Sequence, residues 1–492
     1  MSAQPTLSGD PKTKTQIRFH NTMSGQTEPF VPLVPDEVHM YTCGPTVYDY
    51  AHIGNFRTFV FQDVLRRYLH SKGFRVIQVM NLTDVDDRII QKSAAAGVII
   101  REYTDKFIQA YLDDRRALNL EPPEHVARAT EHIDDMVKLI ERLTEKGFTY
   151  TSEGSTYYRI AKFPAYGKLS KIDVAGMQTG ARVDMDRYDK DNARDFALWK
   201  AHKPGEHFWD TPIGPGRPGW HIECAAMALK YLGNTLDIHS GGVDLTFPHH
   251  ENEIAESEAA TGKTFVRYWL HAEFLLVDQE KMSKSIGNFA TLRELFSHGH
   301  KPSSVRFLLA SVPYRRQLNF TPETLVGAAS SVERLRNFAA RLAAEKLPEG
   351  SSPAMVDRAA KATDDFDRGM ADDLNTAQAL AAIFDLVRDV NTAMDHGEFR
   401  QGDLPAVQDV LTAFDAIFAV LRDDDAEKLK ALGIVPAAPA LSDADVEARI
   451  SERQAARKRR DFAASDQIRD ELAERGIIIE DSRDGSVRWK RK

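Results

Sequence analysis

Val38-His39-Met40-Tyr41-Thr42-Cys43, followed at once by Gly44-Pro45, is the stretch that decides the fold of this chain. An apolar run of this length that ends in glycine and proline predicts a buried strand. A helix is predicted over 59–71 and a second strand over 74–82, and Thr83 is predicted to cap the next helix. Strand, helix and strand in this order open a parallel sheet. We therefore expect an α/β protein with a Rossmann-like sheet, which binds ligands where its strands end.

The turn between that strand and helix carries His52-Ile53-Gly54-Asn55. Histidine followed by glycine at such a turn lets the backbone approach a nucleotide and directs a helix N-terminus at its phosphates. Much further along lies Lys281-Met282-Ser283-Lys284-Ser285, whose two lysines can stabilise the charge that develops as pyrophosphate leaves. Alone, this second stretch is equally compatible with a solvated turn. The two together, in this order, resemble the signature of class I aminoacyl-tRNA synthetases.

Changes in composition along the chain predict several domains. With 42% hydrophobic residues among 492, packed cores are expected. Proline and glycine interrupt the α/β pattern after residue 121, helical apolar stripes follow from about residue 326, and Gly433–Ala440 has the composition of a linker. We expect the following order: a disordered tail over 1–15, a Rossmann-like catalytic domain over 16–325 with an insertion at about 121–215, a helical bundle over 326–430, a linker over 431–441 and a small C-terminal α+β domain over 442–492.

Charge and hydropathy argue against a membrane-spanning protein, a secreted protein and a general binder of polyanions. No apolar run approaches the ~20 residues of a membrane span, and the first twenty residues lack the apolar core of a signal peptide, so a cytoplasmic protein without membrane contact is expected. The formal net charge of −9 argues against a general binder of polyanions. The segment Ser451–Lys492 differs, with 12 Lys and Arg against 9 Asp and Glu. Its two predicted helices and the hairpin at Asp484-Gly485 form either a solvated basic surface or an RNA contact.

Only two cysteines occur, Cys43 and Cys224, so a disulfide scaffold is excluded for a chain of this length. Each alone reads by default as a small buried hydrophobe. His249 and Glu253 follow Pro248 at a spacing that places them on one helix face. Two thiolates, an imidazole and a carboxylate are a plausible set of Zn²⁺ ligands. The spacing does not decide between such a site and an ion-paired helix surface.

Several stretches beyond the signature resemble the cysteinyl-tRNA synthetase family. They are Tyr41–Asp49, Asn81–Asp87, Arg194–Lys200, Gly219–Cys224, Phe247–Glu253 and Asp372–Thr376. The resemblance extends from about residue 16 to the C-terminus, and it implies that the helical bundle binds tRNA and that the C-terminal domain recognises the anticodon.

The resemblance also assigns roles to individual residues. It implies one Zn²⁺ per subunit, held by Cys43, Cys224, His249 and Glu253. It implies catalytic roles for His52, Asn55, Lys281 and Lys284, and binding of ATP, which enters with Mg²⁺, by His52, Gly54, Asn55 and Lys284. Contacts to the amino acid are expected from Gly44, Thr46, Thr83, Trp220, His221 and Asp244. Asn55 departs from the general signature, which has a second histidine there, although an amide can still donate a hydrogen bond to phosphate or ribose.

The implied activity is ATP-dependent ligation of L-cysteine to tRNA(Cys) through a cysteinyl-adenylate, by a monomer. Cysteine and serine differ too little in shape for a pocket to separate them well, whereas zinc favours a thiolate over a hydroxyl. Two alternatives stay open. One is a ligase that joins cysteine to a sugar amine in mycothiol synthesis, which lacks an anticodon-recognition tail. The other is a paralogue that only binds RNA, which has no need of the signature lysines or the zinc ligands.

Overall fold

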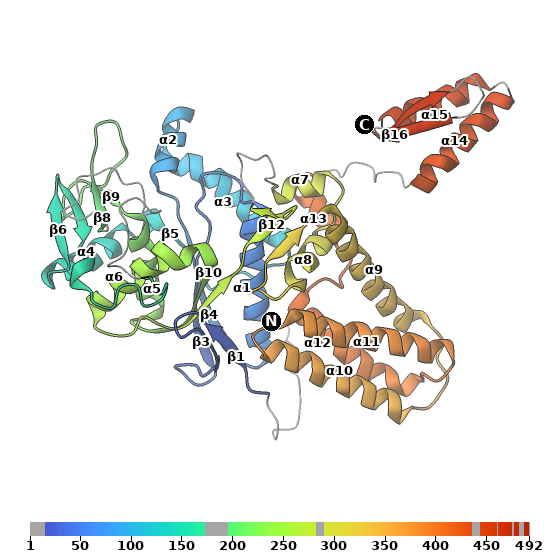
Figure 1. The fold of residues 1–492 in the computed structure, drawn as a ribbon, viewed down its shortest axis with the longest axis horizontal. Helices are drawn as coiled ribbons and strands as arrows, with labels where there is room; N and C mark the ends of the chain where they lie inside the picture. Colours follow the sequence, from blue (N-terminus) through green and yellow to red (C-terminus); the bar gives the residue numbers. More distant parts are fainter. Residues whose placement is uncertain are drawn as a thin grey trace. The chain divides into compact units, whose positions relative to one another are not determined.

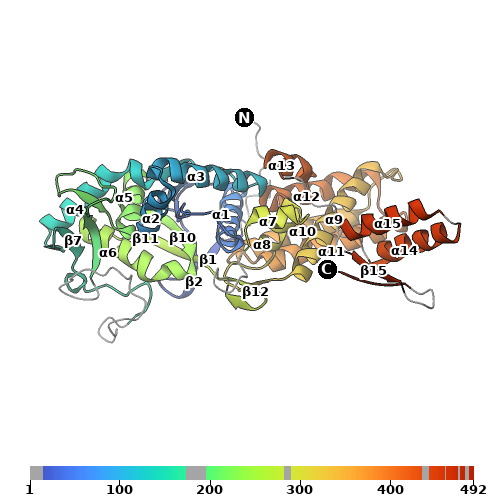
Figure 2. The same cartoon turned by 90° about the horizontal axis from the view of Figure 1, so that it is seen from above.

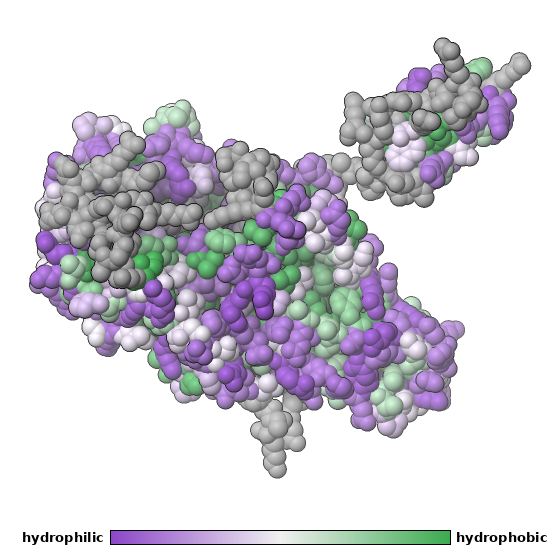
Figure 3. Space-filling view, viewed as in Figure 1, coloured by the Kyte–Doolittle hydropathy of each residue, from purple (hydrophilic) through white to green (hydrophobic). Residues whose placement is uncertain are grey.

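The computed structural model describes residues 15–172, 195–281, 290–434, 443–459, 461–474, 477–481 and 487–491. The chain divides into two compact units, Met1–Arg293 with Lys301–Leu432, and Glu294–His300 with Gly433–Lys492. Among the described residues, no helix is both long and apolar enough to cross a membrane. On the face shown in Figure 3, hydrophilic residues are spread widely, with smaller hydrophobic areas between them.

A five-stranded parallel sheet forms the core of the first unit (Figure 1). Its strand order is β11 (Val266–Ala272), β10 (Leu236–Gly242), β3 (Glu37–Thr42), β4 (Arg75–Leu82) and β5 (His125–Arg128). The chain proceeds outward from β3 through β4 to β5, and later adds β10 and β11 on the other side. The order of strands therefore reverses between β3 and β10, which is where sheets of this type bind ligands. This sheet confirms the predicted Rossmann-like α/β class.

Helix α1 (Ile53–Ser71) connects β3 to β4 and begins earlier than the apolar stripe predicted. The ring of His52 accepts a hydrogen bond from the Asn55 N–H (3.3 Å), and the Asn55 side-chain oxygen accepts one from the His52 N–H (3.1 Å). This reciprocal cap satisfies donors that the first turn leaves without intrahelical partners. The signature stretch His52–Asn55 therefore forms the N-terminal cap and first turn of α1.

Thr83 does not cap the next helix, so that prediction is wrong. Helix α2 (Asp87–Ala96) is capped by Asp86, whose carboxylate accepts a hydrogen bond from the Ile89 N–H (2.6 Å). Thr83 instead continues from β4 and pairs with Thr46, and its buried hydroxyl donates to Glu223 (3.0 Å). An aspartate oxygen reaches the third residue of the helix as well as a threonine hydroxyl does. The helix therefore begins at Asp87, and Asp86 takes the capping role expected of Thr83.

Three strands of an antiparallel sheet lie within the predicted insertion at about 121–215, and its fourth strand follows directly. Its strands, in order, are β6 (Thr149–Ser152), β7 (Ser155–Tyr158), β8 (Phe196–Ala201) and β9 (Gly216–Pro218). Strand β5 falls in the same predicted region, yet it pairs with β4 in the parallel sheet. The Pro122-Pro123 pair that suggested a break is the loop leading into β5. The remaining elements that surround both sheets are β1 (Arg18–Asn21), β2 (Gln26–Pro29), α3 (Ile100–Ala117), α4 (Ile133–Glu145), α5 (Trp220–Leu232) and α6 (Glu251–Thr261).

A small three-stranded sheet leads toward the second signature stretch. Strand β12 (Leu275–Val277) pairs antiparallel with β13 (Glu280–Lys281) and parallel with β14 (Leu318–Phe320). The backbone of Lys281 thus ends a strand, whereas Lys284 lies outside the described residues. The chain is described again from Ala290, before α7 (Leu292–Ser297).

Helices make up the rest of the first unit. They are α8 (Pro302–Ser311), α9 (Pro322–Ala344), α10 (Pro353–Ala371), α11 (Thr376–Asp395), α12 (Leu404–Phe418) and α13 (Asp425–Ala431). Figures 1 and 2 both show α1 between the parallel sheet and these helices. We call α9 to α12 the bundle; its interior is apolar, with Phe338, Ile383 and Phe414 fully buried or nearly so.

A buried ion pair joins α1 to the bundle. Arg306 of α8 and Asp63 of α1 have side chains only 1% and 3% exposed, and Nη2 of Arg306 lies 2.5 Å from Oδ2 of Asp63. The same guanidinium donates to the carbonyls of Phe418 at the end of α12 and Leu118 at the end of α3 (2.8 Å to Leu118). A buried cation is stable only when its donors are paired. Arg306 therefore holds three elements at one point.

The second unit has its own small core. Helices α14 (Asp443–Lys458) and α15 (Phe462–Glu474) pack with an antiparallel hairpin of β15 (Ile477–Asp481) and β16 (Val487–Arg491). Val446, Ile450, Leu472 and Ile477 are buried together. These elements match the two helices and hairpin expected from the sequence, and the predicted turn at Asp484-Gly485 lies outside the described residues.

We predict that Arg306→Met destabilises the first unit by about 3–5 kcal/mol, because buried Asp63 then keeps only Arg67 as a cationic partner among the described residues and the carbonyls of Leu118, Ile417 and Phe418 lose their donor. Denaturant unfolding of the full chain measures this. The control is Arg388→Met, since Arg388 forms its ion pairs with Asp385 and Asp389 on an exposed surface of α11. Equal unfolding midpoints for the two variants would contradict a joining role for Arg306.

Candidate active site

A cluster of sulfur, nitrogen and oxygen donors is buried where β3 and β10 end. Cys43 follows β3, and its N–H donates to the carbonyl of Ser240 on β10 (3.1 Å). Cys224 comes from α5, Glu253 from α6, and His249 from the turn before α6. The potential ligand atoms of these four residues all lie within 4.8 Å of one another, and both cysteines are free thiols. The fold thus brings together Cys43, Cys224 and the His249–Glu253 turn, three segments that are far apart in the sequence.

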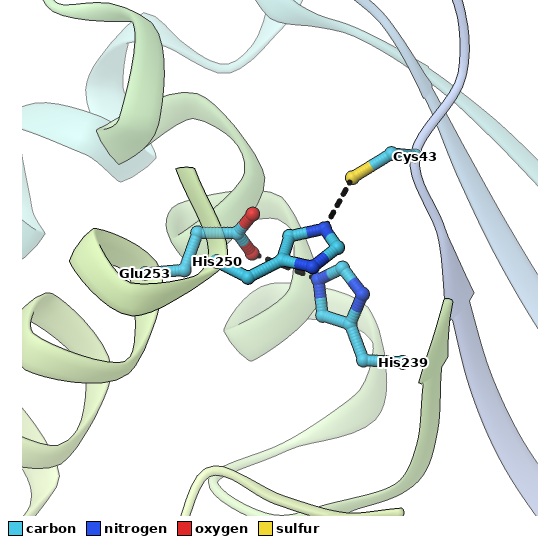
Figure 4. Close-up of side chains that lie close together, drawn as sticks. All are labelled: Cys43, His239, His250 and Glu253. Carbon is cyan, nitrogen blue, oxygen red and sulfur yellow. Dashed lines mark hydrogen bonds and ion pairs between the residues drawn. The ribbon is translucent and has the colours of Figure 1, made fainter. Parts of the chain in front are cut away.

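A second set of four shares two of these residues. Cys43, His239, His250 and Glu253 also place their ligand atoms within 4.8 Å of one another (Figure 4). Nε2 of His250 lies 3.3 Å from the Cys43 sulfur, and Nε2 of His239 lies 2.9 Å from Oε2 of Glu253. Sequence reasoning missed His239 and His250 as cluster members. His250 offered a weak signal because it adjoins His249, whereas His239 is one residue of a buried strand.

Further imidazoles fix the orientation of the cluster. Nδ1 of His221 lies 2.9 Å from Nδ1 of His249, and Nδ1 of His250 lies 2.8 Å from Nε2 of His271. The indole ring of Trp220 stacks on the ring of His249, with centroids 4.4 Å apart and planes at 22°. Hydrogen bonds of this kind determine which ring nitrogen is free to bind a metal.

Burial sets the protonation of the cluster. It raises the pKa of the Cys43 thiol, and together with the hydrogen bond to Cys43 it raises the pKa of Cys224 well above its usual range. Burial also raises the pKa of Glu253 to about 7 and lowers that of His249 to about 4. At neutral pH the thiols therefore carry protons and the His249 ring is neutral. A divalent cation that binds here must displace thiol protons, so its affinity falls as the pH falls.

The residues present fit a metal ion. Oε1 of Glu253 is buried and makes no hydrogen bond among the described residues, although Nε2 of His249 lies 3.1 Å away, and no lysine or arginine of that part of the chain bonds to Glu253 or to either cysteine. Sulfur, imidazole and carboxylate donors within one small buried space suit a borderline-soft divalent cation. The cluster could therefore hold a metal ion.

The other residues expected to contact the amino acid lie around this cluster. The N–H of Gly44 donates to the side-chain oxygen of Asn81 (2.8 Å), and a Cβ at Gly44 would stand 1.9 Å from the Asn81 carbonyl oxygen. Only glycine fits there. Thr46 is half-buried, and Thr83 is buried with its hydroxyl donated to Glu223. His221 is buried, Trp220 is half-buried, and Asp244 is exposed in the turn that follows β10.

The backbone at the start of α1 contacts the chain at Ala290 and Thr291, beyond the lysine-containing stretch. The N–H of Ile53 donates to the carbonyl of Ala290 (2.9 Å), and His52 forms an isolated bridge with Thr291. At Gly54 a Cβ would stand 2.9 Å from Nδ1 of His52, so glycine permits the cap at the start of α1. The start of α1 is thereby fixed against the residues that follow the lysine-containing stretch.

Comparisons with known proteins agree with this architecture. A family model described as the catalytic domain of class I (C) tRNA synthetases matches residues 29–330, and a DALR domain model matches 365–422. A solved methionyl-tRNA synthetase from Mycobacterium tuberculosis has the same fold, with a TM-score of 0.59 and 17% identity over 81% of this chain and 94% of that one. Fold and catalytic-domain model together define a class I aminoacyl-tRNA synthetase.

Full-length relatives define the family more narrowly. The chain is 57% identical to the cysteine–tRNA ligase of Solibacter usitatus (strain Ellin6076) and 55% identical to that of Koribacter versatilis (strain Ellin345). Each comparison covers 97% of this chain and 100% of the relative. A model of the anticodon binding domain of cysteinyl-tRNA ligase matches residues 439–489. The chain belongs to the cysteinyl-tRNA synthetase family, which confirms the resemblance found in the sequence.

We predict that Glu253→Gln lowers the metal affinity of the protein by at least about 100-fold, because both candidate ligand sets contain this carboxylate. Competition with a coloured chelator measures the affinity. Glu258→Gln is the matched control on the same helix, since Glu258 pairs with Lys168 and belongs to neither set. Full affinity in Glu253→Gln would show that the cluster is not the metal site.

Proposed function

We propose that this protein ligates L-cysteine to tRNA(Cys) with ATP, releasing pyrophosphate and then AMP. One observation carries the proposal: a buried set of two thiols, an imidazole and a carboxylate lies at the end of β3, and one of its members, Cys43, belongs to the same strand-to-helix connection as His52–Asn55. A site for the thiol of cysteine and a site for ATP would then be neighbours. Membership of the cysteinyl-tRNA synthetase family supports the same reaction.

We propose further that the metal is zinc, one ion per chain, held by Cys43, Cys224, His249 and Glu253. With this set bound to the metal, the two neighbouring imidazoles would orient the ligands: Nε2 of His239 would donate to Oε2 of Glu253, and Nδ1 of His221 would accept from Nδ1 of His249. Hydrogen bonds that orient metal ligands through their remaining polar atom are usual at zinc sites. The alternative set would leave the buried Cys224 thiol, whose sulfur lies within 4.8 Å of the Cys43 sulfur, without a role.

Zinc, when bound, supplies a soft Lewis acid that prefers the thiol sulfur of cysteine to the hydroxyl oxygen of serine. The protein's own part is to place the substrate. Trp220 and Thr83 would line the side-chain pocket, and Gly44, Thr46, His221 and Asp244 would contact the rest of the amino acid. The Thr83 hydroxyl donates to Glu223 and accepts from the amide of Asn81, which leaves one acceptor position for the substrate.

The nucleotide would lie against the start of α1, whose N-terminal end attracts phosphate. Asn55 uses its side-chain oxygen to cap the helix, so its amide NH₂ remains to donate to the nucleotide. An asparagine can therefore cap the helix and donate to the nucleotide at the position where the general signature has histidine. His52, the other residue of the cap, would also contact the nucleotide. Mg²⁺ would bind with the phosphates.

In the first step, the cysteine carboxylate attacks the α-phosphorus of ATP and pyrophosphate leaves. Lys281 and Lys284 would stabilise the negative charge that develops on the leaving phosphates. In the second step, a terminal hydroxyl of the tRNA attacks the carbonyl carbon of cysteinyl-adenylate and AMP leaves. Holding the reactants in line supplies much of the rate. Because one chain carries all these residues, we propose that the protein acts as a monomer. We also propose that it acts in the cytoplasm, where its substrates occur.

Two assays on one preparation test this function. Cysteine-dependent exchange between ATP and pyrophosphate reports activation, and transfer of labelled cysteine to tRNA(Cys) reports the complete reaction. Activation without transfer to tRNA, but with transfer to an amino sugar, would favour the mycothiol-type ligase. Binding of tRNA without either activity would favour an RNA-binding paralogue.

We predict that Cys224→Ser loses the zinc and raises the KM for cysteine by about 100-fold or more, with little change in the KM for ATP, because only the thiol's binding partner is removed. His239→Asn is the matched test of the alternative set and should retain about one zinc. Elemental analysis and exchange kinetics measure both effects. Loss of zinc in His239→Asn with retention in Cys224→Ser would overturn the proposed ligand set.

We predict that truncation after Leu432 preserves cysteine activation and raises the KM for tRNA by at least about tenfold, because the removed segment forms a separate core and includes Ser451–Lys492, with 12 Lys and Arg against 9 Asp and Glu. The proposed role of that segment is anticodon recognition. The two assays are run on one truncated preparation. Unchanged transfer to tRNA would exclude this role, and loss of both activities would make the segment a structural part of the catalytic unit.

A further inference from the structure

The turn between α10 and α11 has a backbone conformation that calls for an explanation. Asp373 and Leu374 are consecutive residues with φ of 55° and 52°. Residues with a Cβ rarely occupy this left-handed region, and two in succession persist only where the surroundings hold them. The turn belongs to the stretch Asp372–Thr376, which none of the steps above uses.

The contacts that hold the turn come from outside the bundle. The carboxylate of Asp373 is 11% exposed. It accepts hydrogen bonds from the N–H of His20 (2.8 Å), the hydroxyl of Tyr314 (2.6 Å) and Nε of Arg315 (2.6 Å). The N–H of Asp373 donates to the carbonyl of Arg18 (3.0 Å). The turn therefore joins the bundle to β1 and to the segment between α8 and β14.

That segment is tied in turn to α1. The ring of Tyr314 stacks on the ring of Phe61, with centroids 4.2 Å apart and planes at 11°. Arg57, also on α1, donates to the carbonyls of Val312 and Pro313 (2.9 Å each). These contacts hold the segment from the side of α1, independently of Asp373.

The same segment continues toward both signature stretches. It leads into β14, which pairs with β12, and β12 pairs with β13, which ends at Lys281. Helix α1, on which Phe61 and Arg57 lie, begins at His52. A continuous set of contacts therefore connects the α10–α11 turn with the candidate nucleotide site.

We propose that Asp373 is a positioning residue for the transfer of cysteine to tRNA. It fixes the bundle against the segment Val312–Arg316, so that an RNA bound along the bundle presents its terminal hydroxyl to the adenylate in the correct place. This inference rests on the proposed function. It assigns Asp373 to the second step alone, because Arg57 and Phe61 hold the catalytic side of the joint without it.

The test compares full-length Asp373→Ala and Asp373→Asn with the unaltered protein. Cysteine-dependent pyrophosphate exchange should stay within about twofold, whereas single-turnover transfer from preformed cysteinyl-adenylate to tRNA should slow by about 10- to 100-fold in Asp373→Ala, as expected for a small misplacement of reactants. The transfer rate of Asp373→Asn should lie between those of Asp373→Ala and the unaltered protein. Its amide oxygen still accepts a hydrogen bond from Tyr314 but does not pair with the charge of Arg315.

The matched control is Asp389→Asn. Asp389 of α11 pairs with Arg358 of α10 (2.7 Å), so it joins the same two helices without touching the catalytic side. Its transfer rate should equal that of the unaltered protein. Tyr314→Phe keeps the stacked ring and loses the hydroxyl; combined with Asp373→Ala it should slow transfer no further than Asp373→Ala alone.

Three results would overturn the proposal: transfer in Asp373→Ala within about twofold of the unaltered protein, a parallel loss of exchange and transfer, or equal slowing by Asp389→Asn. A parallel loss would mean that Asp373 only stabilises the fold. Failure of the proposed function is distinguishable, because the unaltered protein would then lack exchange or transfer before any variant is compared.

Discussion

Burial of two thiols, a carboxylate and several imidazoles at the junction of β3 and β10 is the constraint on which the rest of this structure depends. Groups of this kind are costly to bury unless they are hydrogen-bonded or bound to a cation. The parallel sheet makes the burial possible because the carboxyl ends of β3 and β10 meet at one edge, where the order of strands reverses. Helices α5 and α6 then close the cluster with Cys224 and Glu253.

Helix α1 connects this edge with the remainder of the first unit. Its first turn is the nucleotide signature, capped by His52 and Asn55. Further along, Asp63 binds Arg306, and Arg306 reaches the end of α12. A single helix thus carries the candidate ATP site at one end and the attachment of the bundle near its middle. This arrangement gives a physical reason for an RNA contact on the bundle to depend on the same framework as the chemistry.

Local patterns made much of this fold predictable. Strands β3 and β4 and the helix between them follow from apolar runs ended by glycine or proline, and the terminal helices and hairpin follow from periodicity and turn residues. Cap positions were harder, since Thr83 and Asp86 both suit a helix start and only the path of the chain after β4 decides between them. Strand β5 was hidden by the prolines that precede it.

The site was predictable only in part, because its members come from separate segments. Spacing could place His249 and Glu253 on one turn of helix, but it could not bring Cys43 and Cys224 together; the family resemblance supplied that step. His239 reaches the cluster only because β10 pairs with β3, and no local sequence pattern encodes that pairing. Likewise, the contacts of Asp373 with Tyr314 and His20 join segments that the sequence gives no reason to pair.

Zinc bound through both cysteines would compensate the burial of this cluster. X-ray absorption at the zinc edge of the purified protein distinguishes the possible ligand sets, because sulfur and nitrogen neighbours lie at different distances. We expect two sulfur ligands at about 2.3 Å and two nitrogen or oxygen ligands at about 2.0–2.2 Å. A spectrum with one sulfur and a majority of imidazole neighbours would contradict this expectation and would favour the set formed by Cys43, His239, His250 and Glu253.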